Sequence, residues 1–232
     1  MTTTKSRTES IRGVRGGLGQ GLYSLSELRA YLTLEGERKD GERALYWLTE
    51  ALNPVEHRAK QPDYSFSDLI SLFVVRELRK RNVPSNEIAK AEQWGRERFG
   101  IDRPFVRYDV ATDGTDVCFE IDRDEKKPHS VESANRHGQR VLAEPIRDKL
   151  QSVRYTEGRE GVAYEWVPMD GVVLDPTIQF GAPVIAGTRV LTDDAAAIAD
   201  ELGPEATAER LSVELSDIRA AISFQRRVAA LQ

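Results

Sequence analysis

The sequence has a single cysteine, Cys118, among 232 residues. One cysteine excludes a disulfide framework and a zinc site built from cysteine pairs. Long apolar runs are also missing, which excludes an ordinary membrane-spanning helix. The first twenty residues are basic but lack the apolar core of a secretory signal. We therefore expect a protein of the reducing cytoplasm.

Residues that could support catalysis are scarce as well. The three histidines lie in polar sequence, and none has a second ligand at metal-binding spacing. The sequence contains no nucleophile elbow, phosphate loop or zinc-binding helix motif. Asp193 and Asp194 fit the first turn of a helix, where carboxylates favour the helix dipole. We expect no enzyme activity, no metal and no cofactor.

Charge is distributed unevenly along the chain. Residues 1–100 carry 17 Lys and Arg against 14 Asp and Glu, whereas residues 170–232 carry 5 against 10. The net charge of the whole chain is −5. A basic first part and an acidic last part favour two different partners, phosphate for the first and a protein for the second.

Apolar periodicity predicts helices in the first hundred residues and again after residue 190. A capping box, Ser24 with Glu27, starts the first helix. After a polar turn over 36–41, a second helix is expected at about 42–52, and two longer ones follow. Two strands are expected around the Asp113-Gly114 turn, and a last helix is expected with Leu215, Ile218, Ile222, Gln225 and Ala229 in register on one face. The basic end of the third helix, including Arg76, is expected to be solvated.

The first part resembles the MerR-like winged helix over roughly residues 22–99. The residues that carry the resemblance are Tyr23–Leu28, Ala44–Leu48 and Tyr64–Leu69. The resemblance implies that the second helix enters the DNA major groove and that the polar segment after it forms a wing. This segment contains His57 among other polar residues.

The residues themselves also favour DNA binding. A helix that fits the major groove needs basic, amide or aromatic groups on its outer face, and a wing needs cations for the backbone or minor groove. The candidate DNA-binding residues are Lys39, Arg43, Tyr46, Trp47, Arg58 and Lys60. For Trp47 a place in the apolar core is an equally good interpretation, because large aromatic side chains are usually buried.

The last part contains Val173–Pro176, the string Phe180–Val190 and the segment Asp217–Ala221. Over about 170–230 it resembles a bacterial and archaeal domain of formerly unknown function that is regarded as a VapB-like antitoxin domain. The resemblance implies a PIN-like ribonuclease toxin as partner and repression of the chain's own operon. The string has a plainer interpretation, in which its glycines only fix how a strand meets a helix.

Three arginines are the candidate partner-binding residues of this last part. Arg189 follows the second glycine turn and can hold a partner or a dimer mate. Arg219 and Arg226 lie on the outer side of the last helix. Because the surrounding module is acidic, a protein contact is favoured over a second DNA contact.

The sequence therefore predicts a mainly α fold with small β elements (α+β). We expect a flexible tail over 1–21, a winged helix-turn-helix over 22–100, a β-containing connector over 101–169 and a three-helix, helix-turn-helix-like module over 170–232. The predicted function is that of a homodimeric antitoxin and repressor that binds operator DNA and a PIN-like ribonuclease. The alternative is a stand-alone MerR-like regulator that senses a small ligand through 101–169.

Overall fold

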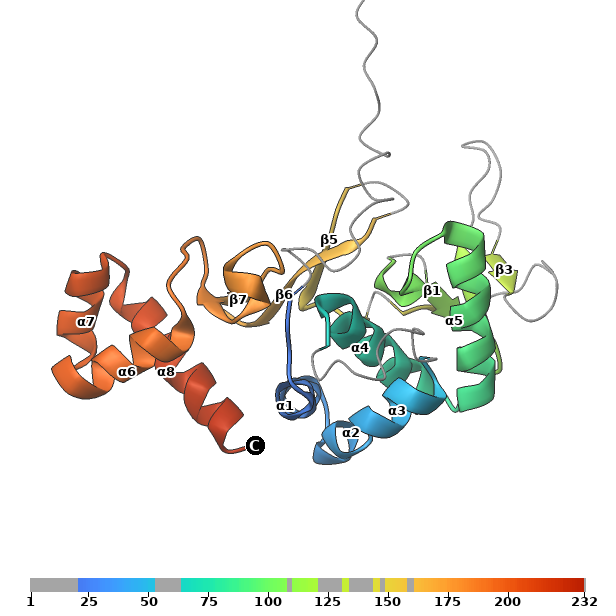
Figure 1. The fold of residues 1–232 in the computed structure, drawn as a ribbon, viewed down its shortest axis with the longest axis horizontal. Coiled ribbons are helices and arrows are strands. Elements are labelled where there is room, and N and C mark those ends of the chain that lie inside the picture. The colour runs from blue at the N-terminus through green and yellow to red at the C-terminus, as the bar shows by residue number, and fades with distance from the viewer. Residues whose placement is uncertain are drawn as a thin grey trace, which may run out of the picture.

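The computed structural model describes residues 21–52, 64–107, 110–120, 131–133, 144–146, 149–157 and 161–231 (Figure 1). The tail predicted over 1–21 lies outside these residues except for Gly21. The described chain is mainly helical with two small antiparallel sheets, which confirms the predicted α+β class. Within the described residues, no helix is both long and apolar enough to cross a membrane.

The first helices begin where the side chains can cap them. Helix α1 (Leu25–Glu35) starts at Ser24, whose hydroxyl accepts from the Glu27 N–H while the Glu27 carboxylate accepts from the Ser24 N–H, as predicted. The polar turn expected over 36–41 is partly helical, which corrects the prediction. A second capping box, between Glu37 and Asp40, starts the short helix α2 (Arg38–Glu42), and α3 (Ala44–Glu50) follows one residue later.

Two longer helices complete the first part. Helix α4 (Phe66–Lys80) is capped by Ser65, and α5 (Ser85–Phe99) ends at Gly100 in a left-handed conformation. Arg76 of α4 was expected in solvent but is only 2% exposed. Its guanidinium lies 5.2 Å from the centre of the Phe73 ring and its Nε donates to Glu77 at 3.1 Å, so a ring and a carboxylate offset the cost of burial.

The first sheet follows α5. Its strands are β1 (Val110–Thr112), β2 (Val117–Glu120), β3 (Val131–Ser133) and β4 (Glu144–Pro145), in the order β3-β2-β1-β4. The predicted hairpin is present but shorter, because Pro104–Val106 forms a turn of 3-10 helix in place of strand. Cys118 lies opposite Ala111 and is fully buried, as expected of a small apolar side chain.

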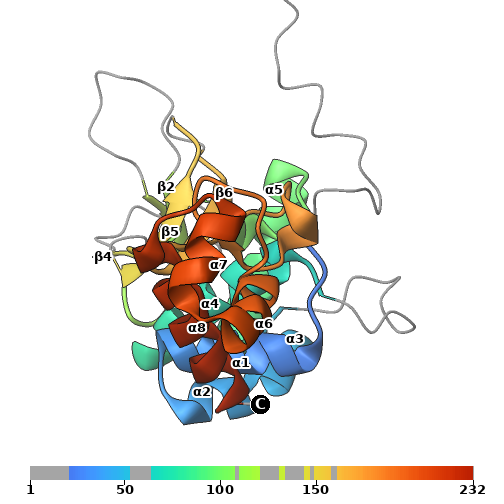
Figure 2. The same cartoon turned by 90° about the vertical axis from the view of Figure 1, so that its left-hand side faces the viewer.

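The second sheet is a meander that leads into the last helices. It contains β5 (Val153–Tyr155), β6 (Ala163–Met169), β7 (Val172–Leu174) and β8 (Val184–Ile185), paired in sequence order. The three predicted helices of the last module follow as α6 (Thr192–Leu202), α7 (Pro204–Leu211) and α8 (Leu215–Ala229). In Figure 1 these helices form one end of the molecule, and Figure 2 views the molecule from that end.

One apolar core connects the two ends of the chain. The Tyr31 ring of α1 lies 5.3 Å from the Trp166 ring of β6 and 6.4 Å from the Phe224 ring of α8. Trp166 also packs on Phe73 at 5.1 Å, and its indole N–H donates to the Glu35 carboxylate at 2.7 Å. Residues from all three predicted regions therefore share a single buried cluster.

Helix α8 turns a slightly different face to this core than predicted. Its buried side chains are Ile218, Ala221, Phe224 and Val228, whereas Ala229 is exposed. The helix packs on α6 and α7 and also on α1, β7 and β8, and Ala229 is its last residue. The buried residues Ile218, Ala221, Phe224 and Val228 therefore form one helix stripe that serves all of these contacts.

Candidate functional site

The predicted DNA-binding residues of the first part form an exposed surface on α2 and α3. We call Lys39, Arg43 and Tyr46 the α2–α3 surface. All three side chains are exposed, and Tyr46 is 52% exposed. Lys39 pairs with Glu37 at 2.9 Å, whereas Arg43 has no ion pair among the described residues. Arg43 stands at the first turn of α3, where a recognition helix contacts bases.

Trp47 does not belong to this surface, which corrects its prediction as a DNA-binding residue. Its side chain is 2% exposed and lies in the core, as the alternative interpretation held. The reason is the packing of α3 on α1, α4 and α5, which buries Ala44, Trp47 and Leu48. Leu45, outside this buried face of the helix, is 43% exposed.

The charge around the α2–α3 surface is balanced. Three exposed carboxylates, Glu37, Glu42 and Glu50, lie near its cations. Arg38 pairs with Glu42 at 3.4 Å. Arg58 and Lys60, the two predicted wing cations, lie outside the described residues. The described part of this surface therefore offers specific donor groups rather than a strong positive field.

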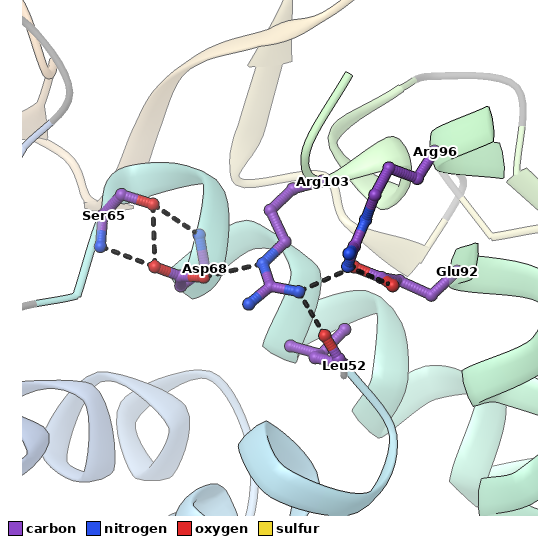
Figure 3. Close-up of polar contacts among 6 residues, drawn as sticks. All are labelled: Leu52, Ser65, Asp68, Glu92, Arg96 and Arg103. Carbon is purple, nitrogen blue, oxygen red and sulfur yellow. Dashed lines mark hydrogen bonds and ion pairs between the residues drawn. The ribbon is translucent and has the colours of Figure 1, made fainter. Parts of the chain in front are cut away.

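A buried ion network fixes the two ends of the predicted wing (Figure 3). Arg103 is 4% exposed, donates from Nε to Asp68 at 2.8 Å and from Nη1 to Glu92 at 2.6 Å. The same Nη1 donates to the backbone carbonyl of Leu52, just beyond α3. Asp68 in turn accepts from the N–H and the hydroxyl of Ser65, which caps α4. One guanidinium therefore ties together the residues that flank segment 53–63.

The charges in this network affect one another. Burial raises the pKa of the Glu92 carboxyl, although Arg103 and Arg96 both favour its ionised form. Arg96 donates to both Glu92 oxygens, at 2.7 and 2.9 Å. Burial disfavours the charged form of Arg103, but Asp68 and Glu92 together outweigh it and raise its pKa. Sequence patterns did not predict this network because its members lie far apart in the chain and share no motif.

A second surface lies where the start of the described chain meets the last module. The Leu22 N–H donates to the Phe180 carbonyl at 3.0 Å, and the Gln179 side chain donates to the Arg189 carbonyl at 3.0 Å. Leu22 is 61% exposed, Phe180 is 55% exposed, and Arg189 is exposed. We call Leu22, Phe180 and Arg189 the Phe180 patch. Arg189 was predicted as a partner-binding residue, whereas Leu22 and Phe180 were not.

The backbone of the Phe180 patch is strained. Gln179 and Phe180 have φ of 47° and 56°, a conformation that side chains with a β-carbon rarely adopt. The next residue is held tightly, because the Tyr23 hydroxyl donates to the Gly181 carbonyl at 2.9 Å. Strain of this kind persists where the surrounding structure enforces it, and it often marks functional surfaces. Here it presents Phe180 to solvent.

The third surface is the outer face of α8. Its exposed side chains include Arg219, Ser223, Arg226 and Arg227, and none of the exposed residues of α8 is acidic. These residues line a groove of about 580 Å³ between α8 and the end of α6, which we call the α8 groove. Arg219 lies 3.4 Å from Glu205, with both side chains more than 60% exposed. The predicted residues Arg219 and Arg226 thus lie together, apart from Arg189.

The described residues contain no group of three or more His, Cys, Asp or Glu side chains arranged to hold a metal ion. Residues 172–224 match the family described as "Protein of unknown function (DUF433)". The fold is similar to that of the X-ray crystal structure of Rv2018 from Mycobacterium tuberculosis, with 20% sequence identity and a TM-score of 0.53. That similarity covers 86% of this chain and 96% of the other. No curated protein matches the sequence. The last module, from β7 into α8, is therefore similar to the DUF433 family.

Proposed function

We propose that this chain is an antitoxin-type regulator that binds operator DNA through the α2–α3 surface and a ribonuclease toxin through its last module. The observation that carries the proposal is the presence of two exposed surfaces of different chemistry on one continuous core. One offers Arg43 and Tyr46 at the start of a helix, and the other offers Phe180 and Arg189 on a strained loop. The resemblances to a MerR-like winged helix and a VapB-like antitoxin domain support the same assignment.

The DNA contact rests on Arg43. An arginine at the start of a recognition helix can donate two hydrogen bonds to a guanine edge. Since no carboxylate among the described residues pairs with Arg43, its donors are available without breaking an ion pair. The neighbouring cations Arg38 and Lys39 are partly neutralised by Glu42 and Glu37. Specific binding is therefore expected to depend on Arg43 more than on general charge.

The protein contact rests on the Phe180 patch. Aromatic and arginine side chains are the residues that contribute most to protein interfaces. Phe180 and Leu22 place apolar area beside the cation Arg189, at the edge of a module whose net charge is negative. An acidic module steers a basic nuclease toward it, and the apolar pair then stabilises the docked complex. Inhibition follows if the docked module blocks the toxin's active site or its RNA path.

The DNA contact is tested by gel retardation with the duplex that lies immediately upstream of the chain's own reading frame. Arg43→Ala should weaken specific binding by about 1–3 kcal/mol and leave binding to a scrambled duplex unchanged. Arg210→Ala, an exposed change on α7, is the matched control. Equal retardation by the wild type and Arg43→Ala would remove the α2–α3 surface from the proposal.

The protein contact is tested by co-expression with the product of the neighbouring reading frame. The two chains should co-elute, and the complex should lack the ribonuclease activity that the partner has alone. Phe180→Ser and Arg189→Ala should release that activity, because they remove the apolar anchor and the cation. If the chain elutes alone and a metabolite changes its affinity for the operator, a ligand-sensing regulator explains the protein better.

A further inference from the structure

The α8 groove gathers most of the positive charge of an acidic module. Residues 170–232 contain five cationic side chains against ten acidic ones. Three of the five, Arg219, Arg226 and Arg227, line this groove, and Asp200 is the acidic residue among its lining residues. Arg226 and Arg227 make no ion pair within the described chain, so their charge is available to a second molecule.

The groove is apolar beneath its charged edge. Ala199 of α6 is 7% exposed, and Ile222 of α8 is partly buried in the module's own apolar cluster. The arginines, by contrast, are exposed. A binding partner must therefore combine an apolar group for the base of the groove with carboxylates for its edge.

The chain itself carries such a group beside the groove. Leu202, the last residue of α6, is 46% exposed although it is a large apolar side chain. Its neighbours Glu201 and Glu205 are exposed carboxylates. We call Leu202, Glu201 and Glu205 the Leu202 knob. In chemistry it is the counterpart of the α8 groove.

The position of the knob adds a symmetry argument. Leu202 stands in the chain between Asp200 and Pro204, which both line the groove, and Glu205 of the knob lies 3.4 Å from Arg219 of the groove, so the knob lies beside the groove. A two-fold axis beside them brings the knob of each copy to the groove of the other, and the contact is made twice. We propose that the occupant of the α8 groove is the Leu202 knob of a second copy of this chain.

A nucleic-acid duplex fits the groove less well than a second copy does. A duplex carries a negative charge about every 1.7 Å along its axis and meets the protein over several base pairs. The exposed carboxylates Asp193, Asp194, Glu201 and Glu209 on α6 and α7 would oppose it. The apolar base of the groove would also gain nothing from phosphates.

The test is a charge exchange between two variants of the full-length chain. The acidic-groove variant carries Arg219→Glu and Arg226→Glu, and the basic-knob variant carries Glu201→Arg and Glu205→Arg. All four side chains are exposed, so little change in folding is expected, and circular dichroism checks it. Both variants remove the ion pair between Arg219 and Glu205, which is weak because both side chains are highly exposed.

Sedimentation velocity from about 1 to 100 µM should detect a wild-type dimer that dissociates as salt rises toward about 1 M. Each variant alone should dimerise about 100-fold or more weakly, because like charges then face each other. Their equimolar mixture should regain the dimer, since both contacts become complementary again. Leu202→Ser should weaken the dimer, and Arg210→Glu, on α7 outside the groove, should not.

Three results would overturn the proposal: a wild-type monomer at every concentration, a dimer that survives in both charge variants, or a mixture that stays monomeric. The experiment needs neither DNA nor a toxin. Its failure therefore leaves the proposed function intact, and failure of the proposed function leaves the dimer result intact. A wild-type monomer that retards duplex DNA through Arg226 would assign the groove to nucleic acid.

Discussion

Phe224 tests whether the last module and the first helices fold as one unit. The side chain belongs to α8 but is 1% exposed in the core that Tyr31 and Trp166 share. Truncation of a buried phenylalanine to alanine costs about 3–5 kcal/mol of unfolding free energy, part of it from the cavity that remains. With a urea slope of about 3 kcal/mol/M, Phe224→Ala should lower the unfolding midpoint by about 1 to 1.7 M.

The tryptophans make the assay informative. The three of them, Trp47, Trp94 and Trp166, all precede the last module, so their fluorescence reports on the first two thirds of the chain and, through the cluster that Trp166 shares with Phe224, on its contact with α8. Far-ultraviolet circular dichroism also detects α6, α7 and α8. If the chain unfolds as one unit, both signals should shift to the same lower midpoint in Phe224→Ala. Ser223→Ala, one residue away and exposed, should change the unfolding free energy by about 0.5 kcal/mol or less.

Fluorescence that keeps its wild-type midpoint while circular dichroism develops an early transition would refute unfolding as one unit. The last module would then unfold by itself, and the aromatic contacts of Phe224 would contribute little to the rest of the molecule. A shift of both signals by less than about 0.3 M would also count against it, because a residue so deeply buried cannot be truncated at so small a cost.

Three further predictions concern buried charge and backbone strain. Arg103→Met should lower the unfolding free energy by about 3–5 kcal/mol in urea titrations, because the buried Asp68 and Glu92 each lose their ion pair with Arg103. The raised pKa of Glu92 means that folding takes up a proton above pH 4.5, so this group's stabilisation is complete at low pH and is lost as pH rises through its folded pKa. The Tm of the wild type minus the Tm of Glu92→Gln should therefore fall as the pH rises from 4.5 toward neutrality. A constant or rising value would contradict the raised pKa of Glu92. Gly181→Ala should cost about 1–3 kcal/mol by thermal melting, since φ is +83° and the new Cβ would lie 2.5 Å from the Tyr23 hydroxyl; Gly187→Ala, with φ +74° and open space, should cost less.

The boundaries of most helices could be predicted because the signals that set them lie in residues close together in the sequence. Ser24 with Glu27 gives a capping box, and Ser65 begins α4 in the same way. Gly203 followed by Pro204 separates α6 from α7, because a proline fits the first position of a helix. These signals act over three or four residues, so they do not depend on the rest of the fold. The start of α2 was missed because its capping box uses Glu37 and Asp40, a pair without the usual Ser or Thr.

The faces of the helices and the candidate sites were less predictable because they depend on distant contacts. Contacts of α3 with α1, α4 and α5 decide that Trp47 is buried and Tyr46 is exposed, and these neighbours are not evident from the local sequence. Arg103 and Phe180 were missed for a similar reason. Their roles follow from contacts with Leu52 and Leu22, each more than fifty residues away in sequence, which local patterns do not encode.

The arrangement of α8 links the surfaces to one another. The average charge of residues 170–232 predicts an acidic module, but the structure separates this charge, with cations along α8 and carboxylates on α6 and α7. The buried face of the same α8 packs on α1, which also contacts α2 and α3. A dimer formed through the α8 groove would therefore set the distance between two α2–α3 surfaces through rigid packing rather than through a linker. Because two half-sites are bound together only at a fixed spacing, the proposed dimer contact would determine operator spacing, and insertions between half-sites should weaken binding unless they add whole helical turns.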